Sequence, residues 1–253
     1  MATVLGFAEL EFDLAKALLS SIIDVFKTMS SAPLLPANVQ GIPEDQGVYQ
    51  LLLNGKTVYI GKTDAEAGLN QRLKRHSYSI QHRKNLDPNQ VSFKAVRLFV
   101  FTPMDLETQL IKTYEPAWNY SGFGSNDPGR NRDKTEFKEE GFDSQYPIDI
   151  DRELEIELPK QAKVSEIAVK LRIALPYTFR FQMKAPKSRV IHPDFEAAQV
   201  NLPDGPYTTR IVIQSILRAL PAGWQATALP SRVILYKETA TYPSGSVIAA
   251  TVA

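Results

Sequence analysis

The sequence predicts an α+β protein: a small antiparallel sheet flanked by helices, an N-terminal helical arm, and a C-terminal α+β domain. Three observations lead to this expectation. The dipeptide Asn54-Gly55, a strong hairpin signal, lies between two apolar runs. Segments with apolar residues at helical spacing lie on both sides of it, and alternating apolar residues return near the C-terminus. With 253 residues, the chain is long enough for more than one domain, and we expect parts at 1–37, 38–148 and 149–253.

Residues 7–29 are expected to form a helix, because apolar residues recur at spacings of three and four. The apolar stripe is wide and needs a partner surface, which is either its own domain or a second subunit. Residues 30–43 are rich in proline and small residues and are interpreted as a linker. The stripe consists of Phe7, Leu10, Leu14, Leu18, Ile22, Val25, Phe26 and Met29.

The central part begins with a hairpin whose strands are expected at 47–53 and 57–60. A helix is expected to start at Thr102-Pro103, where an N-cap residue precedes a proline at the first helical position. The other expected elements follow in order: a helix over 69–80, a strand over 91–101, a helix from 103 to about 114, and a loop over 121–133.

In the C-terminal part, Leu154, Ile156 and Leu158 alternate with glutamates, which predicts a half-exposed strand over 149–158. The elements expected beyond it are a helix over 164–174, a strand over 177–183, a helix over 208–220, and strands over 224–229 and 232–237.

The net charge of +1 results from cancellation between segments. Residues 160–253 carry 12 basic and 5 acidic side chains, and 160–189 carries 8 basic residues against Glu166 alone. A concentrated basic segment is typical of a polyanion-binding surface. The alternative is a solvated face, or pairing with the acidic residues of 153–157.

The chain contains no cysteine, which excludes disulfides, thiolate metal sites and cysteine nucleophiles. No apolar stretch is long enough to cross a membrane. Acidic residues stand near the N-terminus, where a signal peptide has basic ones. We therefore expect a cytoplasmic protein.

Four features with chemical potential follow one another between residues 47 and 132. The first is Gly47-Val48-Tyr49, followed by Tyr59-Ile60-Gly61-Lys62-Thr63; the second is Arg72 and His76, which share one helix face. The third is Glu107, a carboxylate on an apolar helix stripe, where it needs a partner or a metal ion. The fourth is Trp118-Asn119 with a loop containing Gly122, Phe123, Gly124, Pro128, Gly129, Arg130 and Arg132, a composition that suits phosphate contact.

Taken together, these features resemble the GIY-YIG nuclease superfamily. The resemblance is closest to the GIY-YIG type II restriction endonucleases that cut the palindrome CCGCGG, a branch that shares His76, the Trp-Asn pair and the GFG and Pro-Gly loop. The resemblance covers about residues 45–132. Valine replaces isoleucine in the first motif.

The resemblance implies one divalent metal ion, magnesium with manganese as a substitute, held by Glu107. Arg72 would clamp the scissile phosphate and Tyr49 would activate or only orient the attacking water; the sequence leaves these two roles of Tyr49 open. The implied catalytic residues are Tyr49, Tyr59, Arg72, His76, Glu107 and Asn119. The candidate DNA-binding residues are Lys62, Arg130 and Arg132 in this part of the chain and, from the basic segment 160–189, Lys184, Lys187 and Arg189.

The hairpin register presents a conflict. A two-residue Asn54-Gly55 turn would pair Tyr49 with Ile60 and place Tyr59 on the opposite face. A shared site needs Leu51 opposite Tyr59, and we expect a three-residue loop, 54–56, to provide that register.

The function expected from this resemblance is sequence-specific cleavage of double-stranded DNA by a homodimer, with a cognate DNA methyltransferase as a separate protein. The alternatives are a GIY-YIG nuclease of repair or mobile-element type that acts on structured DNA, and a DNA-binding protein that has kept the fold but does not cut.

Overall fold

A computed structural model describes residues 6, 13–63, 68–99, 106–124 and 129–251. The chain divides into two compact units. The N-terminal unit comprises Met1–Lys74 and Asn89–Asn119, and the C-terminal unit comprises Arg75–Pro88 and Tyr120–Ala253. This division differs from the expected parts, since the N-terminal helix belongs with the hairpin and residues 120–148 belong with the C-terminal sheet.

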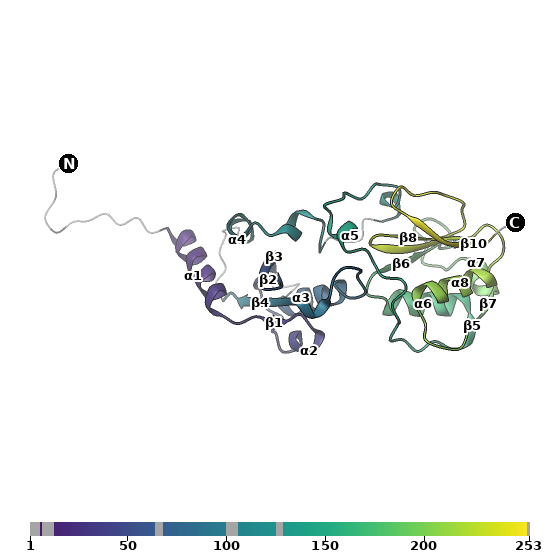
Figure 1. Cartoon of the computed structure of the whole chain (residues 1–253), viewed down its shortest axis with the longest axis horizontal. Helices are drawn as coiled ribbons and strands as arrows, with labels where there is room; N and C mark the ends of the chain where they lie inside the picture. The colour runs from purple at the N-terminus through teal and green to yellow at the C-terminus, as the bar shows by residue number, and fades with distance from the viewer. Residues whose placement is uncertain (1–5, 7–12, 64–67, 100–105, 125–128, 252–253) are drawn as a thin grey trace. The chain divides into compact units, whose positions relative to one another are not determined.

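The N-terminal unit contains a four-stranded antiparallel sheet with the order β1-β4-β2-β3 (Figure 1). Its strands are β1 (Ala32–Pro33), β2 (Gly47–Leu53), β3 (Lys56–Thr63) and β4 (Val91–Arg97). The expected hairpin and the following strand are therefore present.

The segment 30–43, interpreted as a linker, contains strand β1 and the short helix α2 (Pro36–Val39). The linker prediction was wrong because its prolines fit regular structure here. Pro33 lies on an edge strand, where a missing N–H costs no ladder bond, and Pro36 occupies the first turn of α2.

The hairpin register is confirmed: Leu51 lies opposite Tyr59, and Tyr49 lies opposite Gly61. The expected three-residue loop was wrong, because Leu53 pairs with Lys56 around the two-residue turn. Asn54 and Gly55 both have positive φ, 51° and 79°, as a type I′ turn requires. A bulge then shifts the register, since Leu52 pairs with Thr57 and Leu51 pairs with Tyr59. The extra residue puts both tyrosines on one face.

Helix α1 (Leu14–Thr28) packs within its own unit, which is the first of the two alternatives for its apolar stripe. Ile22 and Phe26 are buried in a cluster with residues of the sheet and of helix α4 (Leu106–Tyr114). Helix α3 (Leu69–Ser79) agrees with the prediction, as does the end of α4. Residues 7–12 and the expected helix start at Thr102-Pro103 lie outside the described residues.

The C-terminal unit contains a second four-stranded sheet with the order β10-β8-β9-β6. Strand β6 is parallel to β9 and the other pairs are antiparallel. The helices α6 (Val164–Ala174) and α8 (Thr209–Ala219) and the strands β6 (Thr178–Phe181), β8 (Gln225–Leu229) and β9 (Arg232–Tyr236) match predicted elements. Elements that the sequence analysis missed are α5 (Phe142–Gln145), β5 (Gln161–Lys163), α7 (Pro193–Ala197), β7 (Gln199–Asn201) and β10 (Ser246–Ala250).

The predicted strand over 149–158 was wrong. The segment begins with a turn at 150–151, and its one strand-like pairing is an isolated bridge between Glu153 and Thr208. The alternation still has its expected orientation: Leu154 is buried, Ile156 and Leu158 pack against the core, and the glutamates are exposed. Alternation of apolar and polar residues indicates which side of a segment is buried, but it does not guarantee a neighbouring strand with which the segment can pair.

Strand β9 is buried on both faces of its sheet. Val233 and Leu235 join the large core that contains residues of α6 and α8, the helices on that side of the sheet (Figure 1). Ile234 and Tyr236 point to the other face, where Phe137 packs against their cluster. The segment that the sequence suggested as a free loop therefore continues into a layer over this second face.

None of the helices in the described ranges is both long and apolar enough to cross a bilayer.

Candidate active site

The two motif strands bring Tyr49 and Gly61 face to face in the N-terminal unit. A Cβ atom on Gly61 would overlap the Cζ and Oη atoms of Tyr49, so the tyrosine ring lies directly over the glycine. Gly47 is enclosed in a similar way, because an added Cβ would lie 2.7 Å from Leu69 Cδ1 of α3 and would overlap the Val96 carbonyl oxygen. Both glycines thus allow a close approach that a side chain would prevent.

Tyr49 and Tyr59 form a pair on this face of the hairpin. Their ring centroids are 6.1 Å apart, and their side chains are hydrogen-bonded. Tyr49 is 1% exposed, whereas Tyr59 is partly exposed. The pair therefore joins a buried hydroxyl group to the surface.

Two charged residues from different helices act on the Tyr49 hydroxyl. Burial is the main cause that raises the pKa of Tyr49 well above its ordinary value. The neighbouring Tyr59 and the carboxylate of Glu107 on α4 raise that pKa further, and the guanidinium of Arg72 on α3 lowers it. The raising effects win, so Tyr49 is a neutral phenol at pH 7. Arg72 and Glu107 are both partly exposed.

Asn119 has a structural position beside this group. Its side-chain oxygen accepts a hydrogen bond from Ile60 N at 2.8 Å, and its amide nitrogen donates to Ile60 O at 2.7 Å. Strand β3 is the edge of its sheet, so Asn119 satisfies backbone groups that no further strand covers. With both polar atoms on Ile60, Asn119 holds the backbone of β3 at this point.

Residues 47–145 match the family model described as the Eco29kI GIY-YIG domain. This segment is an Eco29kI-type GIY-YIG domain. The family consists of restriction endonucleases, which cleave DNA at a specific site, and Eco29kI itself recognises CCGCGG. No sequence among the curated proteins matched the chain.

GIY-YIG nucleases generally use a divalent metal ion. The described residues contain no cluster of three or more His, Asp or Glu side chains that could hold one. Glu107 alone offers a partly exposed carboxylate beside Tyr49. A carboxylate oxygen is a hard ligand of the kind that oxygen-coordinated divalent cations take. The residues fit a divalent ion that takes its other ligands from water and substrate.

His76 of the GIY-YIG domain is placed in the C-terminal unit. It is 2% exposed and stacks on Phe123, with ring centroids 4.9 Å apart and an interplanar angle of 19°. Arg75 donates to the Gly124 carbonyl, so this turn of α3 holds the GFG segment by two contacts. These contacts fix the His76 ring against the GFG segment.

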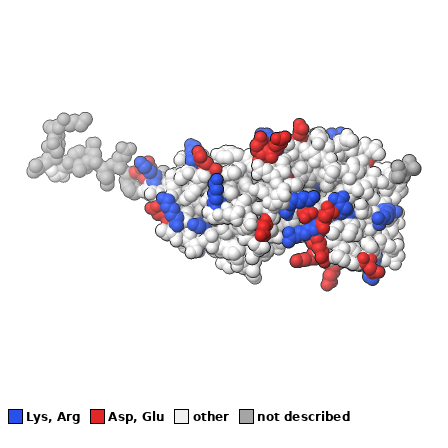
Figure 2. All heavy atoms as spheres, viewed as in Figure 1, with Lys and Arg blue, Asp and Glu red and all other residues white. Residues whose placement is uncertain are grey.

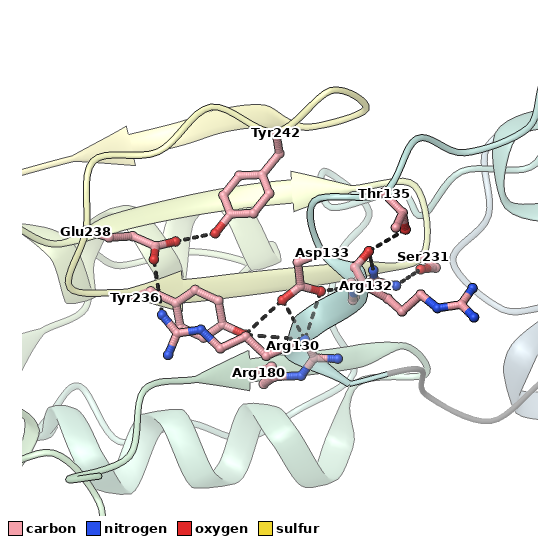
Figure 3. Close-up of polar contacts among 10 residues, drawn as sticks. Arg130, Arg132, Asp133, Thr135, Arg180, Ser231, Tyr236, Glu238 and Tyr242 are labelled. Atoms are coloured by element: carbon pink, nitrogen blue, oxygen red, sulfur yellow. Dashed lines mark hydrogen bonds and ion pairs between the residues drawn. The ribbon is translucent and has the colours of Figure 1, made fainter. Parts of the chain in front are cut away.

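The Gly/Arg-rich loop of the domain ends at Asp133, which is 1% exposed (Figure 3). Arg180 donates to both Asp133 oxygens at 2.8 and 2.7 Å, and Arg232 donates to one of them at 2.7 Å. The Tyr236 hydroxyl donates to Asp133 at 3.1 Å. Two guanidinium groups thus offset one buried carboxylate.

This network was missed by sequence reasoning. Asp133 lies at the end of the predicted loop 121–133, and Arg180 lies within the basic segment 160–189. The partners of Asp133 are 47, 99 and 103 residues away, so no local spacing could have indicated the contacts.

The six predicted DNA-binding residues differ in their surroundings. Arg130 pairs with Glu238 at 3.1 Å, and its guanidinium lies 4.1 Å from the Tyr236 ring centroid (Figure 3). The positive charge of Arg130 is therefore offset by the carboxylate of Glu238. All six residues are exposed, Arg130 together with Lys62, Arg132, Lys184, Lys187 and Arg189.

Proposed function

We propose that this chain is a restriction endonuclease that hydrolyses phosphodiester bonds of double-stranded DNA at a specific sequence, with one magnesium ion held by Glu107. The observation that supports this most directly is the environment of Tyr49. Tyr59, Arg72 and Glu107, three residues of the family motif from three different elements, all act on its hydroxyl group.

Arg72 suits the scissile phosphate, because a guanidinium can donate two parallel hydrogen bonds to phosphate oxygens. Its positive charge would stabilise the additional negative charge that develops in the transition state. When bound, magnesium would supply Lewis-acid stabilisation of the phosphate and leaving oxygens. Manganese, which has similar ligand preferences, is expected to substitute.

The raised pKa of Tyr49 bears on the two roles left open by the sequence. A neutral phenol is a poor base, but it can accept a hydrogen bond from water and donate one of its own. We therefore propose that Tyr49 orients the attacking water, and that the partly exposed Tyr59 completes the hydrogen-bonded pair.

A palindromic target with two symmetric cuts is most simply met by a twofold homodimer on DNA. A separate methyltransferase would protect the host's own sites. The apolar stripe of α1 no longer argues for a dimer, since Ile22 and Phe26 are buried within their own unit.

The test is digestion of plasmids of known sequence by the purified full chain with magnesium. Discrete bands that map to one sequence would support the proposal, with loss of cleavage in Glu107→Ala. The matched control is Glu139→Ala, which removes an exposed carboxylate of the C-terminal unit. Smearing, or nicking confined to branched DNA, would favour the repair or mobile-element alternative, and DNA binding without cleavage would favour the non-cutting one.

A further inference from the structure

The basic segment 160–189 is not a uniformly charged surface. Three of its lysines form ion pairs: Lys160 with Asp204, Lys163 with Glu196 at 3.5 Å, and Lys170 with Glu166 at 4.0 Å. Figure 2 likewise shows positive and negative side chains next to one another over the C-terminal unit on the face drawn. The acidic partners are not the glutamates of 153–157 that the sequence suggested as one alternative.

Two arginines of the same segment are also engaged. Arg180 binds the buried Asp133, and Arg172 lies over the ring of Phe181, 5.0 Å from its centroid. Five of the eight cations in the segment therefore have partners within the protein. The remaining three are Lys184, Lys187 and Arg189.

These three cations lie on one short turn, 184–190, which is held by its own backbone. Lys184 N donates to Val190 O at 2.9 Å, and Ser188 N donates to Ala185 O at 3.0 Å. Ser188 accepts a further bond through its hydroxyl, from Val190 N at 3.0 Å. The turn follows strand β6, and its base is closed by a bridge between Met183 and Ile191.

The turn presents its charges to solvent. Lys184, Lys187 and Arg189 are exposed, and none of them makes an ion pair with a described carboxylate. Lys187 has a φ of 63°, a conformation that a lysine rarely adopts and that the surrounding hydrogen bonds must maintain. The turn therefore offers three unneutralised cations on a backbone that is already ordered, which lowers the entropy cost of binding a polyanion.

We propose that the turn 184–190 is a DNA-backbone contact of this enzyme, outside the segment that matches the GIY-YIG domain. Its side chains bind phosphate oxygens and add sequence-independent affinity. This inference rests on the proposed function for the identity of the polyanion, which is duplex DNA.

The experiment measures DNA affinity against salt concentration for the full-length protein without metal, so that no cleavage occurs. The test variant is Lys184→Ala/Lys187→Ala/Arg189→Ala. The matched control is Lys160→Ala/Lys163→Ala/Lys170→Ala, which removes the same number of charges from the same segment but only from ion-paired positions.

If all three turn residues contact phosphate, the slope of log affinity against log salt should become shallower by about 2.7 in the test variant. The control should keep a slope close to that of the wild type. Wild-type slope in the test variant, or equal loss in both variants, would overturn the proposal. Thermal unfolding of both variants confirms that each is folded.

The two proposals can fail separately. If the wild-type protein gives discrete plasmid bands but the test variant keeps the wild-type salt slope, the proposed function stands and the DNA contact of the turn is refuted. If the salt slope becomes shallower in the test variant but the wild-type protein never cuts DNA, the DNA contact of the turn stands and the endonuclease assignment is refuted.

Discussion

The ring of Tyr49 covers Gly61, its partner on the neighbouring strand, so closely that Gly61 has no room for a Cβ atom. This packing explains why a tyrosine and a glycine stand at these two motif positions. The glycine creates the space and the tyrosine ring fills it, at a position where the charges of Arg72 and Glu107 act on its hydroxyl group.

Replacing Gly61 should therefore displace the Tyr49 hydroxyl. We expect Gly61→Ala to lower the cleavage rate by about 10²-fold, the cost of a misplacement of about 1 Å at a reacting group. The control is Gly41→Ala, where an added Cβ meets nothing within 4 Å. Cleavage assays and thermal unfolding of both variants test this, and a fully active Gly61→Ala would contradict the assigned geometry.

Glu107 and Arg72 should be separable by their effects on binding. Each alanine variant should lose at least about 10²-fold in cleavage, because each removes charge stabilisation from the transition state. Glu107→Ala should keep its DNA affinity without metal, since a carboxylate near phosphates opposes binding, whereas Arg72→Ala should bind less tightly. Cleavage by Glu107→Ala at the wild-type rate would remove the metal assignment.

The raised pKa of Tyr49 predicts an effect on stability at alkaline pH. The folded state holds the phenolic proton of Tyr49 more tightly than the unfolded state, in which the pKa of a tyrosine side chain is about 10. The stabilisation is therefore complete below pH about 10 and is lost as the pH rises toward the folded-state pKa. Tyr49→Phe should show a smaller loss of stability than the wild type above this pH.

Denaturant unfolding at several pH values would measure the difference between Tyr49→Phe and the wild type. Tyr236, whose pKa burial raises to about 12, contributes in the same direction in both proteins and cancels in the comparison. Identical pH profiles for the two proteins would mean that Tyr49 ionises as freely in the folded chain as in the unfolded one.

Arg130 and Arg132 should behave differently although they are two residues apart. Arg132→Ala should make the salt slope of DNA binding shallower by about 0.9 without loss of stability, as expected for one phosphate contact. Arg130→Ala should keep the slope and lower the unfolding temperature, because its guanidinium binds Glu238 and covers Tyr236. The reverse pattern would show that the internal partners of Arg130 are exchanged for DNA.

The packing of α1 predicts a loss of stability rather than of self-association. Phe26 is 1% exposed, and Phe26→Ala should cost about 3–5 kcal/mol of unfolding free energy. Val25, 43% exposed, provides the control Val25→Ala, with little expected effect. Denaturant unfolding measures both, and ultracentrifugation would reveal a change in oligomeric state if this helix formed a subunit interface instead.

Local patterns in the sequence predicted local structure well. Helix α6 was predicted residue for residue, and the range predicted for α8 differs from the helix only by its two capping residues, Thr208 and Leu220, because apolar spacing and caps are encoded within each segment. The strand over 149–158 failed for a different reason, since pairing depends on a partner elsewhere in the chain. The register that places Tyr59 opposite Leu51 was inferred only from the need for a shared site, and the bulge that produces it was not foreseen, since a three-residue loop was expected instead.

The candidate site was predictable where the motif residues act together, as for Tyr49, Tyr59, Arg72 and Glu107. It was not predictable for Arg130, since its sequence context matches that of Arg132. Only the folded chain, which brings Glu238 and Tyr236 beside one of them, distinguishes the two arginines.

The contacts of Asp133 also limit how this chain could exchange parts with proteins that contain a similar domain. The family match ends at residue 145, yet the side chains that neutralise Asp133 lie on β6 and β9. A recombination crossover at that boundary would leave the carboxylate buried against a foreign sheet, at a cost of about 3–5 kcal/mol. Viable hybrids would need to inherit Arg180 and Arg232 together with the domain. New C-terminal regions would then be acquired by gradual substitution more readily than by exchange of gene segments.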